Sequence, residues 1–134
     1  MINLLGWIVY GATTIAAGGV VDNPTPNSNG VVGEVTSLPY TVPSGHTLTI
    51  TSMQVEGPAC DYSSNSSQFG MGIWLGSAPC TNSKWIASCT TTGGSNQNTN
   101  MNLELPAGTI LNLRMMNNTS NAWVDGWYVE GQLN

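Results

Sequence analysis

The stretch GWYVEG at residues 126–131 has a near-copy, GWIVYG, at residues 6–11. Both contain Trp, Val and flanking Gly in the same order, and they lie close to opposite ends of the chain. Short apolar segments bounded by Gly are typical of β-strands. The sequence therefore predicts a similar strand at each end, as in a jelly roll, where the first and last strands can lie in one sheet.

Both faces of these two predicted strands are apolar. One face carries Leu5, Trp7 and Val9 at the start of the chain, with Trp123, Trp127, Val129 and Leu133 at its end, and the other carries Leu4, Ile8, Tyr10, Val124 and Tyr128. A strand in a lone antiparallel sandwich usually has one face in water. We therefore expect another polypeptide to cover the second face, since burying one large side chain contributes roughly 1.5–3 kcal/mol. The alternative is that both are ordinary core strands.

The flanking glycines would let a neighbouring chain approach closely. Seven residues are the expected contacts with other subunits or a shell, although some of them must instead belong to the core: Leu5, Trp7, Ile8, Tyr10, Trp123, Trp127 and Tyr128.

The composition limits the classes of partner. The chain has 134 residues, enough for a single domain spanning 1–134, and 40% of them are hydrophobic. Only 7% are charged, and two basic residues, Lys84 and Arg114, face seven acidic ones for a net charge of −5. Nucleic acid and anionic membranes both require clustered cations, so we expect neither as a partner.

The rest of the chain predicts an all-β fold without helices. Apolar residues alternate at period two between clusters of Gly, Pro, Asn and Ser, one of which is GGSNQN at 93–98. This pattern predicts a single antiparallel β-sandwich or jelly roll of about eight strands. The expected strands are 4–10, 31–38, 47–56, 69–76, 84–88, 99–105, 109–117 and 122–131.

The alternation changes phase inside the strand expected at 47–56. Leu48 and Ile50 share one face, whereas Met53 and Val55 fall on the other. A β-bulge near Thr51–Ser52 would bring all four side chains inward, and this is the interpretation we favour over a strand that is buried on both faces.

No group of residues indicates an enzyme or a cofactor. His46 is the sole histidine and lies in a predicted turn beside Ser44, which is poor geometry for a nucleophile and its base. Asp125 and Glu130 are five residues apart on one strand, so they face opposite ways and cannot act together as glycosidase carboxylates. The loop at 22–30 lacks the acidic density of a calcium site, and no metal or other cofactor is expected.

Three cysteines leave the disulfide pattern open. Cys80 and Cys89 could close a short loop, Cys60 and Cys80 are another possible pair, and free buried thiols agree equally well with the sequence.

Carbohydrate binding is a second class of function that the composition allows. Five tryptophans occur in this short chain, and Trp85 and Tyr62 lie in or beside polar loops rich in residues that can hydrogen-bond to hydroxyl groups. Tryptophan is also favoured in β cores and at subunit interfaces, which explains the same residues without a sugar.

Two strings, TVPSGHTLTITSMQVEG and LPAGTILNLRMMNNTSNAWVDGWYVEGQLN, carry a resemblance. They lie within about residues 40–56 and 103–134, and they resemble parts of small jelly-roll proteins of bacteriophage virions, namely capsid cement or decoration proteins and the heads of tail fibres. The resemblance implies a homotrimer on the outer surface of a capsid, bound non-covalently to the major capsid protein. It assigns no individual functional residue.

These expectations combine into a structural virion protein located on the capsid surface. Residues 1–26 would form an N-terminal strand or an arm that contacts neighbouring subunits. The alternative is a secreted, lectin-like carbohydrate-binding module or a receptor-binding fibre head.

Overall fold

The computed structural model is all-β, as the sequence predicts. It describes residues 5–57, 69–76, 85–91, 94–98 and 101–134, which contain ten strands and no helix. The strands are β1 (Leu5–Ile15), β2 (Val20–Asp22), β3 (Tyr40–Thr41), β4 (Leu48–Gly57), β5 (Phe69–Leu75), β6 (Trp85–Thr91), β7 (Gly94–Asn98), β8 (Leu103–Leu105), β9 (Ile110–Asn117) and β10 (Trp123–Leu133).

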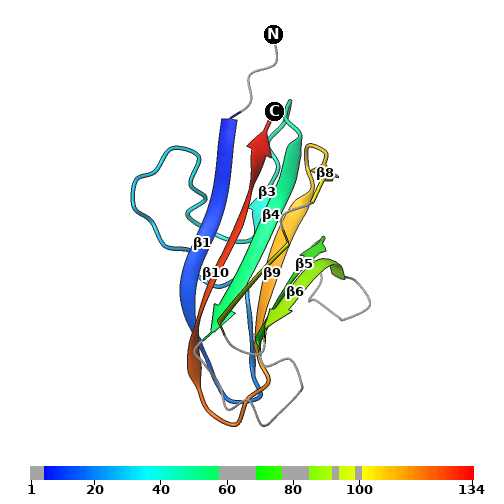
Figure 1. Cartoon of the computed structure of the whole chain (residues 1–134). Coiled ribbons are helices and arrows are strands. Elements are labelled where there is room, and N and C mark those ends of the chain that lie inside the picture. The colour runs from blue at the N-terminus through cyan, green and yellow to red at the C-terminus, as the bar shows by residue number, and fades with distance from the viewer. Residues whose placement is uncertain (1–4, 58–68, 77–84, 92–93, 99–100) are drawn as a thin grey trace.

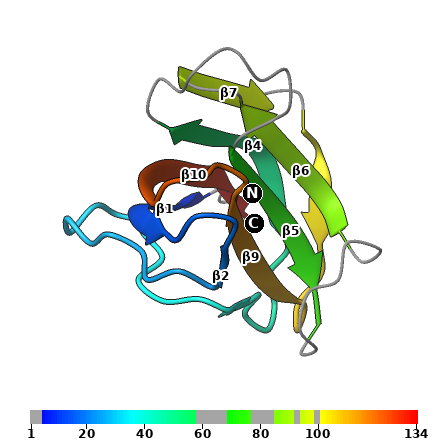
Figure 2. The ribbon, with the colours of Figure 1, turned by 90° about the horizontal axis from the view of Figure 1, so that it is seen from below.

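The strands form two antiparallel sheets of five strands each. The first sheet has the order β1-β10-β4-β7, with β8 also paired to β4, and the second has the order β2-β9-β5-β6, with β3 also paired to β9. The long strands β1, β10 and β4 lie side by side in Figure 1, and Figure 2 shows the two sheets in the view from below. Apolar side chains from both sheets form one core cluster between them.

The two similar stretches at the chain ends pair with each other. β1 runs antiparallel to β10 from Leu5 opposite Leu133 to Ile15 opposite Trp123. In this register Trp7 lies opposite Gly131, and Trp127 lies opposite Gly11. The repeated order of Trp and Gly therefore places a glycine across from each of these tryptophans. At Gly11 the group that approaches closely is Trp127, from the other end of the same chain.

The inner faces of β1 and β10 form part of the core. Trp7 and Trp127 are each 4% exposed, and Val9 and Val129 are fully buried between them. A Cβ atom on Gly11 would lie 2.7 Å from Cζ2 of Trp127, so the indole ring occupies the space that a side chain would need. The indole Nε1 of Trp127 also donates a hydrogen bond of 3.0 Å to the Thr13 hydroxyl.

The bulge expected near Thr51–Ser52 is confirmed. Ser52 pairs with Glu130 whereas Ile50 pairs with Gly131, so Thr51 is the extra residue of β4. The bulge changes the phase of the strand, and Leu48, Ile50, Met53 and Val55 are consequently all buried.

Two expected local structures are wrong. Residues 31–38 form no strand, because Gly33 has a φ of 84° and the segment makes only one isolated bridge, between Glu34 and Ile8. Residues 93–98, expected as a turn, instead contain β7. This strand has no apolar residue, so its period-two pattern is invisible in the sequence. The short strands β2 and β3 were also not expected. With these two and β7 added, and with 31–38 removed, the described residues contain ten strands rather than about eight.

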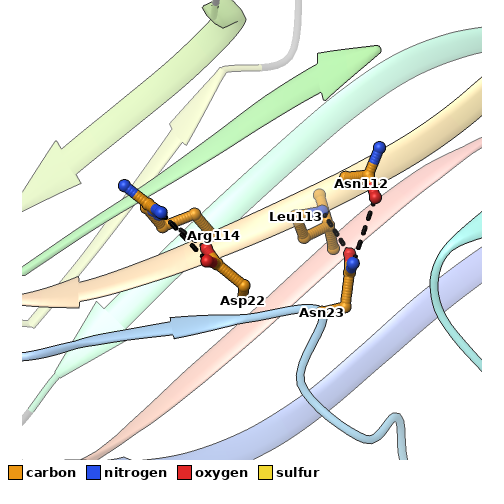
Figure 3. A network of polar contacts seen from close by, with 5 residues as sticks. All are labelled: Asp22, Asn23, Asn112, Leu113 and Arg114. Carbon is orange, nitrogen blue, oxygen red and sulfur yellow. Dashed lines mark hydrogen bonds and ion pairs between the residues drawn. The ribbon is translucent and has the colours of Figure 1, made fainter. Parts of the chain in front are cut away.

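The segment expected to form an N-terminal strand or arm is built into both sheets. After β1, the chain crosses to the second sheet, where β2 pairs with β9. Arg114 donates two hydrogen bonds to the carboxylate of Asp22, from Nε at 2.6 Å and from a terminal nitrogen at 2.9 Å (Figure 3). Asn23 has a φ of 49°, accepts a bond from the Leu113 N–H and donates one to Asn112 Oδ1, both at 3.0 Å.

Substitution of Gly11 by Ala tests the contact between the two chain ends. The new methyl group would displace the Trp127 ring, so we expect a loss of unfolding free energy of about 1–3 kcal/mol. Gly6→Ala is the matched control, because a Cβ there meets no atom within 4 Å. Its expected effect is within about 0.5 kcal/mol. Urea unfolding measures both.

The double variant Gly11→Ala, Trp127→Phe provides a further check, since a smaller ring relieves the clash. We expect it to lose less stability than the sum of the two single variants. Strictly additive losses would mean that Gly11 and Trp127 do not make the contact described.

Candidate functional site

The outer face of the first sheet carries a row of two tyrosines and an amide. Tyr10 on β1 lies opposite Tyr128 on β10, and Tyr128 in turn lies opposite Gln54 on β4. Side chains opposite each other on adjacent strands are about 4.5–5.5 Å apart at Cβ. All three are half-buried. The row therefore presents aromatic surface with a hydrogen-bonding group at one end.

The next row on the same face contains two small residues and a glutamate. Ala12, Gly126 and Glu56 lie opposite one another on the same three strands. A Cβ on Gly126 would lie 2.7 Å from Oε1 of Glu56 and 2.9 Å from its Cγ. The missing side chain of Gly126 thus lets Glu56 lie across the sheet, where its Oε2 is 3.4 Å from Gln54 Nε2.

A loop from the same chain stands beside the tyrosine row. Segment 27–35, part of the light-blue loop beyond β1 in Figure 1, follows the free edge of that strand. Backbone bonds join Ile8 N–H to Gly33 O at 3.0 Å, Val35 N–H to Ile8 O at 2.8 Å, and Asn27 N–H to Tyr10 O at 2.8 Å. The edge of β1 is therefore covered by its own chain.

Glu34 fastens this loop to β1. Its carboxylate accepts bonds from the Tyr10 hydroxyl at 2.9 Å, the Asn29 N–H at 2.8 Å and the Val31 N–H at 3.3 Å, and Asn29 Nδ2 donates to the Tyr10 hydroxyl at 2.8 Å. Desolvation opposes ionisation of Glu34, but these donors, led by Tyr10, outweigh it and lower its pKa. Desolvation, followed by the bond to Glu34, raises the pKa of Tyr10.

Together these elements line a hollow of about 550 Å³ that is open to solvent, here called the tyrosine hollow. Its lining comes from three strands and the loop: Ile8 and Tyr10 on β1, Tyr128 on β10, Gln54 and Glu56 on β4, and Asn29 and Val31 on the loop. Its volume lies within the range of about 300–1,000 Å³ that is usual for small-molecule sites.

A second hollow, of about 460 Å³, lies on the other side of the loop and is here called the edge pocket. Its lining includes Leu5, Trp7, Val32, Tyr40 and Leu133. The rings of Trp7 and Tyr40 meet edge to face, with centroids 5.4 Å apart. Val32 is 91% exposed and Leu5 is 52% exposed, so apolar surface at this pocket is open to solvent.

The structure sorts the seven expected contact residues. Trp7 and Trp127 are core residues, each 4% exposed, and the little surface they keep lines the edge pocket and the tyrosine hollow, respectively. Trp123 is half-buried and packs against the core. Ile8, Tyr10 and Tyr128 line the tyrosine hollow, and Leu5 lines the edge pocket. The cover that we expected from another subunit comes in part from segment 27–35, which the sequence did not indicate.

Asp125 is fully buried on β10, between Trp123 and Trp127 on the inner face. Neither carboxyl oxygen has a hydrogen-bond donor in the described part of the chain. Desolvation raises the pKa of Asp125 from 3.8 to about 7. Glu130 on the same strand is exposed, which confirms that the two carboxylates face opposite ways.

Other side chains considered for chemistry do not converge. Within residues 5–57, 69–76, 85–91, 94–98 and 101–134 no group of His, Cys, Asp and Glu could hold a metal ion. His46 Nδ1 lies 3.1 Å from the carbonyl oxygen of Asn134, a contact that joins the turn to the chain end. The possible disulfide between Cys80 and Cys89 lies outside the described residues, because Cys80 is not among them.

Comparisons with known proteins add little. No protein-family model and no curated protein sequence matches the chain. A solved structure with limited likeness is described as "The crystal structure of Drosophila NLP-core provides insight into pentamer formation and histone binding"; it is 11% identical and covers 94% of this chain and 98% of that one. Its TM-score of 0.32 is too low to support an inference about this chain. Among the described residues there is also no helix long and apolar enough to cross a membrane.

The raised pKa of Asp125 predicts that the free energy of unfolding decreases as the pH rises. Its pKa of about 7 in the folded state exceeds the ordinary value of 3.8, so the folded state binds this proton more tightly. The stabilisation is complete below about pH 4 and is lost as the pH rises through about 7. Asp125→Asn removes the buried charge, so we expect it to stabilise the protein at pH 8 by up to about 4 kcal/mol, and by little at pH 4.

Urea unfolding between pH 4 and 8 measures this effect, and Glu104→Gln, at an exposed carboxylate, controls for the change in net charge. A variant that retains the wild-type dependence on pH would show that another group is responsible.

The lowered pKa of Glu34 predicts the opposite effect, a stability that decreases as the pH falls. Its pKa is lowered, so its contribution is present above its ordinary value of 4.5 and is lost as the pH falls through the lower folded value. We expect Glu34→Gln to lower Tm at pH 7, and the difference from the wild type to shrink as the pH falls and the Glu34 carboxylate becomes protonated. Equal Tm values at pH 7 would contradict a role for this carboxylate in holding the loop.

Proposed function

We propose that the chain is a structural virion protein of the capsid cement or decoration class. In this proposal it is a jelly roll that assembles as a homotrimer, binds the outer surface of a phage capsid and stabilises the shell by non-covalent contacts with the major capsid protein. The proposal assigns it no catalytic role and no cofactor.

The observation that carries the proposal is the exposed apolar surface beside β1. Val32 protrudes into solvent next to the edge pocket, and Leu5 adds exposed apolar area to the same surface. Exposed aliphatic side chains beside an apolar hollow are typical of protein–protein contact sites. We therefore place the contact between subunits at the edge pocket.

A second copy of this chain is the occupant that we propose for the edge pocket. The contact would be heterologous, with the edge pocket and Val32 of one subunit against a different surface of the next, and such contacts close into rings when the rotation permits. A trimeric ring matches the local three-fold axes of a capsid lattice. The low charge supports close packing, because few ions would have to be desolvated in the contacts.

The proposed mechanism is stabilisation by binding. A protein that binds the assembled shell but not its dissociated subunits shifts the equilibrium toward the shell by mass action. Each bound trimer would touch several shell subunits at once, so dissociation of one subunit would also require loss of contacts to the trimer.

The alternative function is a secreted lectin-like module or a receptor-binding fibre head. It depends on a different surface, the tyrosine hollow, and it does not require the edge pocket.

Val32→Asp tests the proposed subunit contact. We expect the wild type to be a trimer by light scattering at micromolar concentration, and Val32→Asp to weaken assembly at least about tenfold, because a carboxylate would be buried in an apolar contact. Val124→Asp is the matched control, since Val124 is also exposed, at 55%, but lies near the opposite end of the same sheet. The control should remain trimeric.

The monomeric variant should stay folded by circular dichroism, because Val32 contributes almost nothing to the core. Binding of the wild type to purified capsids of the phage whose genome encodes it, and weaker binding of Val32→Asp, would support the virion role. A wild-type chain that remains folded and monomeric at high micromolar concentration would contradict it.

A further inference from the structure

We propose that the tyrosine hollow is a binding site for a neutral carbohydrate. This site is separate from the edge pocket, and the inference does not depend on the virion role. It rests on the aromatic row, on the polar groups beside it and on the charge of the described lining, which contains Glu56 but no Lys or Arg.

The aromatic row provides the surface on which a sugar ring can lie. A pyranose has a face of C–H groups and a rim of hydroxyls, so it requires an apolar surface next to hydrogen-bonding groups. Tyr10 and Tyr128 are adjacent in the strand register on the outer face and both line the tyrosine hollow. Tyrosine combines an apolar ring with a polar tip, which suits a surface that is partly wet.

The hydrogen-bonding groups lie on two sides of this row. Gln54 and Glu56 project from β4, and Asn29 projects from the loop. Amides both donate and accept, whereas a carboxylate accepts from two oxygens. Such a mixture matches hydroxyl groups, which also donate and accept.

The distribution of charge favours a neutral ligand over an ionic one. Among the described residues that line the hollow there is no Lys or Arg, so an anionic sugar, a phosphate or a sulfate would lie against Glu56 without compensation. A cationic ligand would need an available carboxylate, but that of Glu34 already accepts bonds from Tyr10, Asn29 and Val31. Glu56 alone is a weak basis for cation selectivity, and it lies beside the amide of Gln54.

The size and shape of the site limit the ligand to a short segment. Ala12 keeps the floor low beside the tyrosines, Glu56 lies over Gly126, and the loop residues Asn29 and Val31 form a wall. A volume of about 550 Å³ is within the range usual for small-molecule sites, and the open side allows a longer chain to continue into solvent.

Isothermal titration with the full chain and a panel of neutral trisaccharides, namely maltotriose, cellotriose and tri-N-acetylchitotriose, tests the inference. Sialyllactose and tetramethylammonium serve as the anionic and cationic probes. We expect at least one neutral sugar to bind with a Kd of about 1 mM or tighter, and neither ionic probe to compete with it.

Two variants locate the binding site. Tyr128→Ala should weaken binding at least about tenfold by removing half of the aromatic row, and Glu56→Gln should weaken it about three- to tenfold by replacing a charged acceptor with a neutral amide. Glu130→Gln is the matched control, because Glu130 lies on the same face of β10 but outside the hollow. It should leave affinity unchanged. Circular dichroism and Tm show that each variant is folded.

Three results would overturn the inference. One is that no neutral sugar of the panel binds at about 10 mM, a concentration well above a Kd of about 1 mM. Another is that Glu130→Gln loses as much affinity as Glu56→Gln. The third is that tetramethylammonium or sialyllactose binds more tightly than every neutral sugar. None of these results bears on the trimer, so the two proposals fail independently.

Discussion

The cross-strand contacts between the two ends of the chain determine how the first sheet is assembled. Trp7 lies opposite Gly131, Trp127 lies opposite Gly11, and Val9 lies opposite Val129 between them. Because side chains alternate at period two, a slip of one residue would move both indoles from the core to the outer face. Gly11 leaves room for the ring of Trp127, so the pairing is specified by steric fit as well as by burial. The likeness of the two stretches is therefore explained within one subunit.

This pairing leaves β1 at an edge of the sheet, with β10 as its single long partner. Exposed strand edges favour association with other chains, and proteins commonly cover them. Here segment 27–35 provides the cover through three backbone bonds and through the carboxylate of Glu34. The same segment separates the edge pocket from the tyrosine hollow, because Val32 lines one and Val31 lines the other. Segment 27–35 thus covers the edge of β1 and also lines both the edge pocket and the tyrosine hollow.

The sequence predicted the long strands better than the short ones, for a physical reason. β1, β4, β9 and β10 bury alternating apolar side chains, and burial of that kind leaves a period-two pattern. Even the bulge at Thr51 was predictable, since the phase of the pattern changes there. β7 has the sequence GSNQN, and its position depends on backbone pairing with β4, which leaves no trace in hydrophobicity. The role of segment 27–35 was hidden for the same reason, because its contacts to Ile8 and Tyr10 are formed mainly by backbone groups and one carboxylate.

The sequence pointed to some residues of the candidate site, but it did not show which face of the sheet is buried and which is outer. Ile8, Tyr10 and Tyr128 were expected as contact residues together with Trp7 and Trp127, and only the register separates the two sets. The inner positions are constrained by the core, where each tryptophan is opposed by a glycine. The outer positions carry no such constraint: at the place of Tyr128 a threonine or a lysine would equally complete the wet face of an antiparallel sheet. The aromatic side chain found there pairs with Tyr10 across the strands, which favours the sheet, and in the proposed site it also supplies ring surface to the ligand.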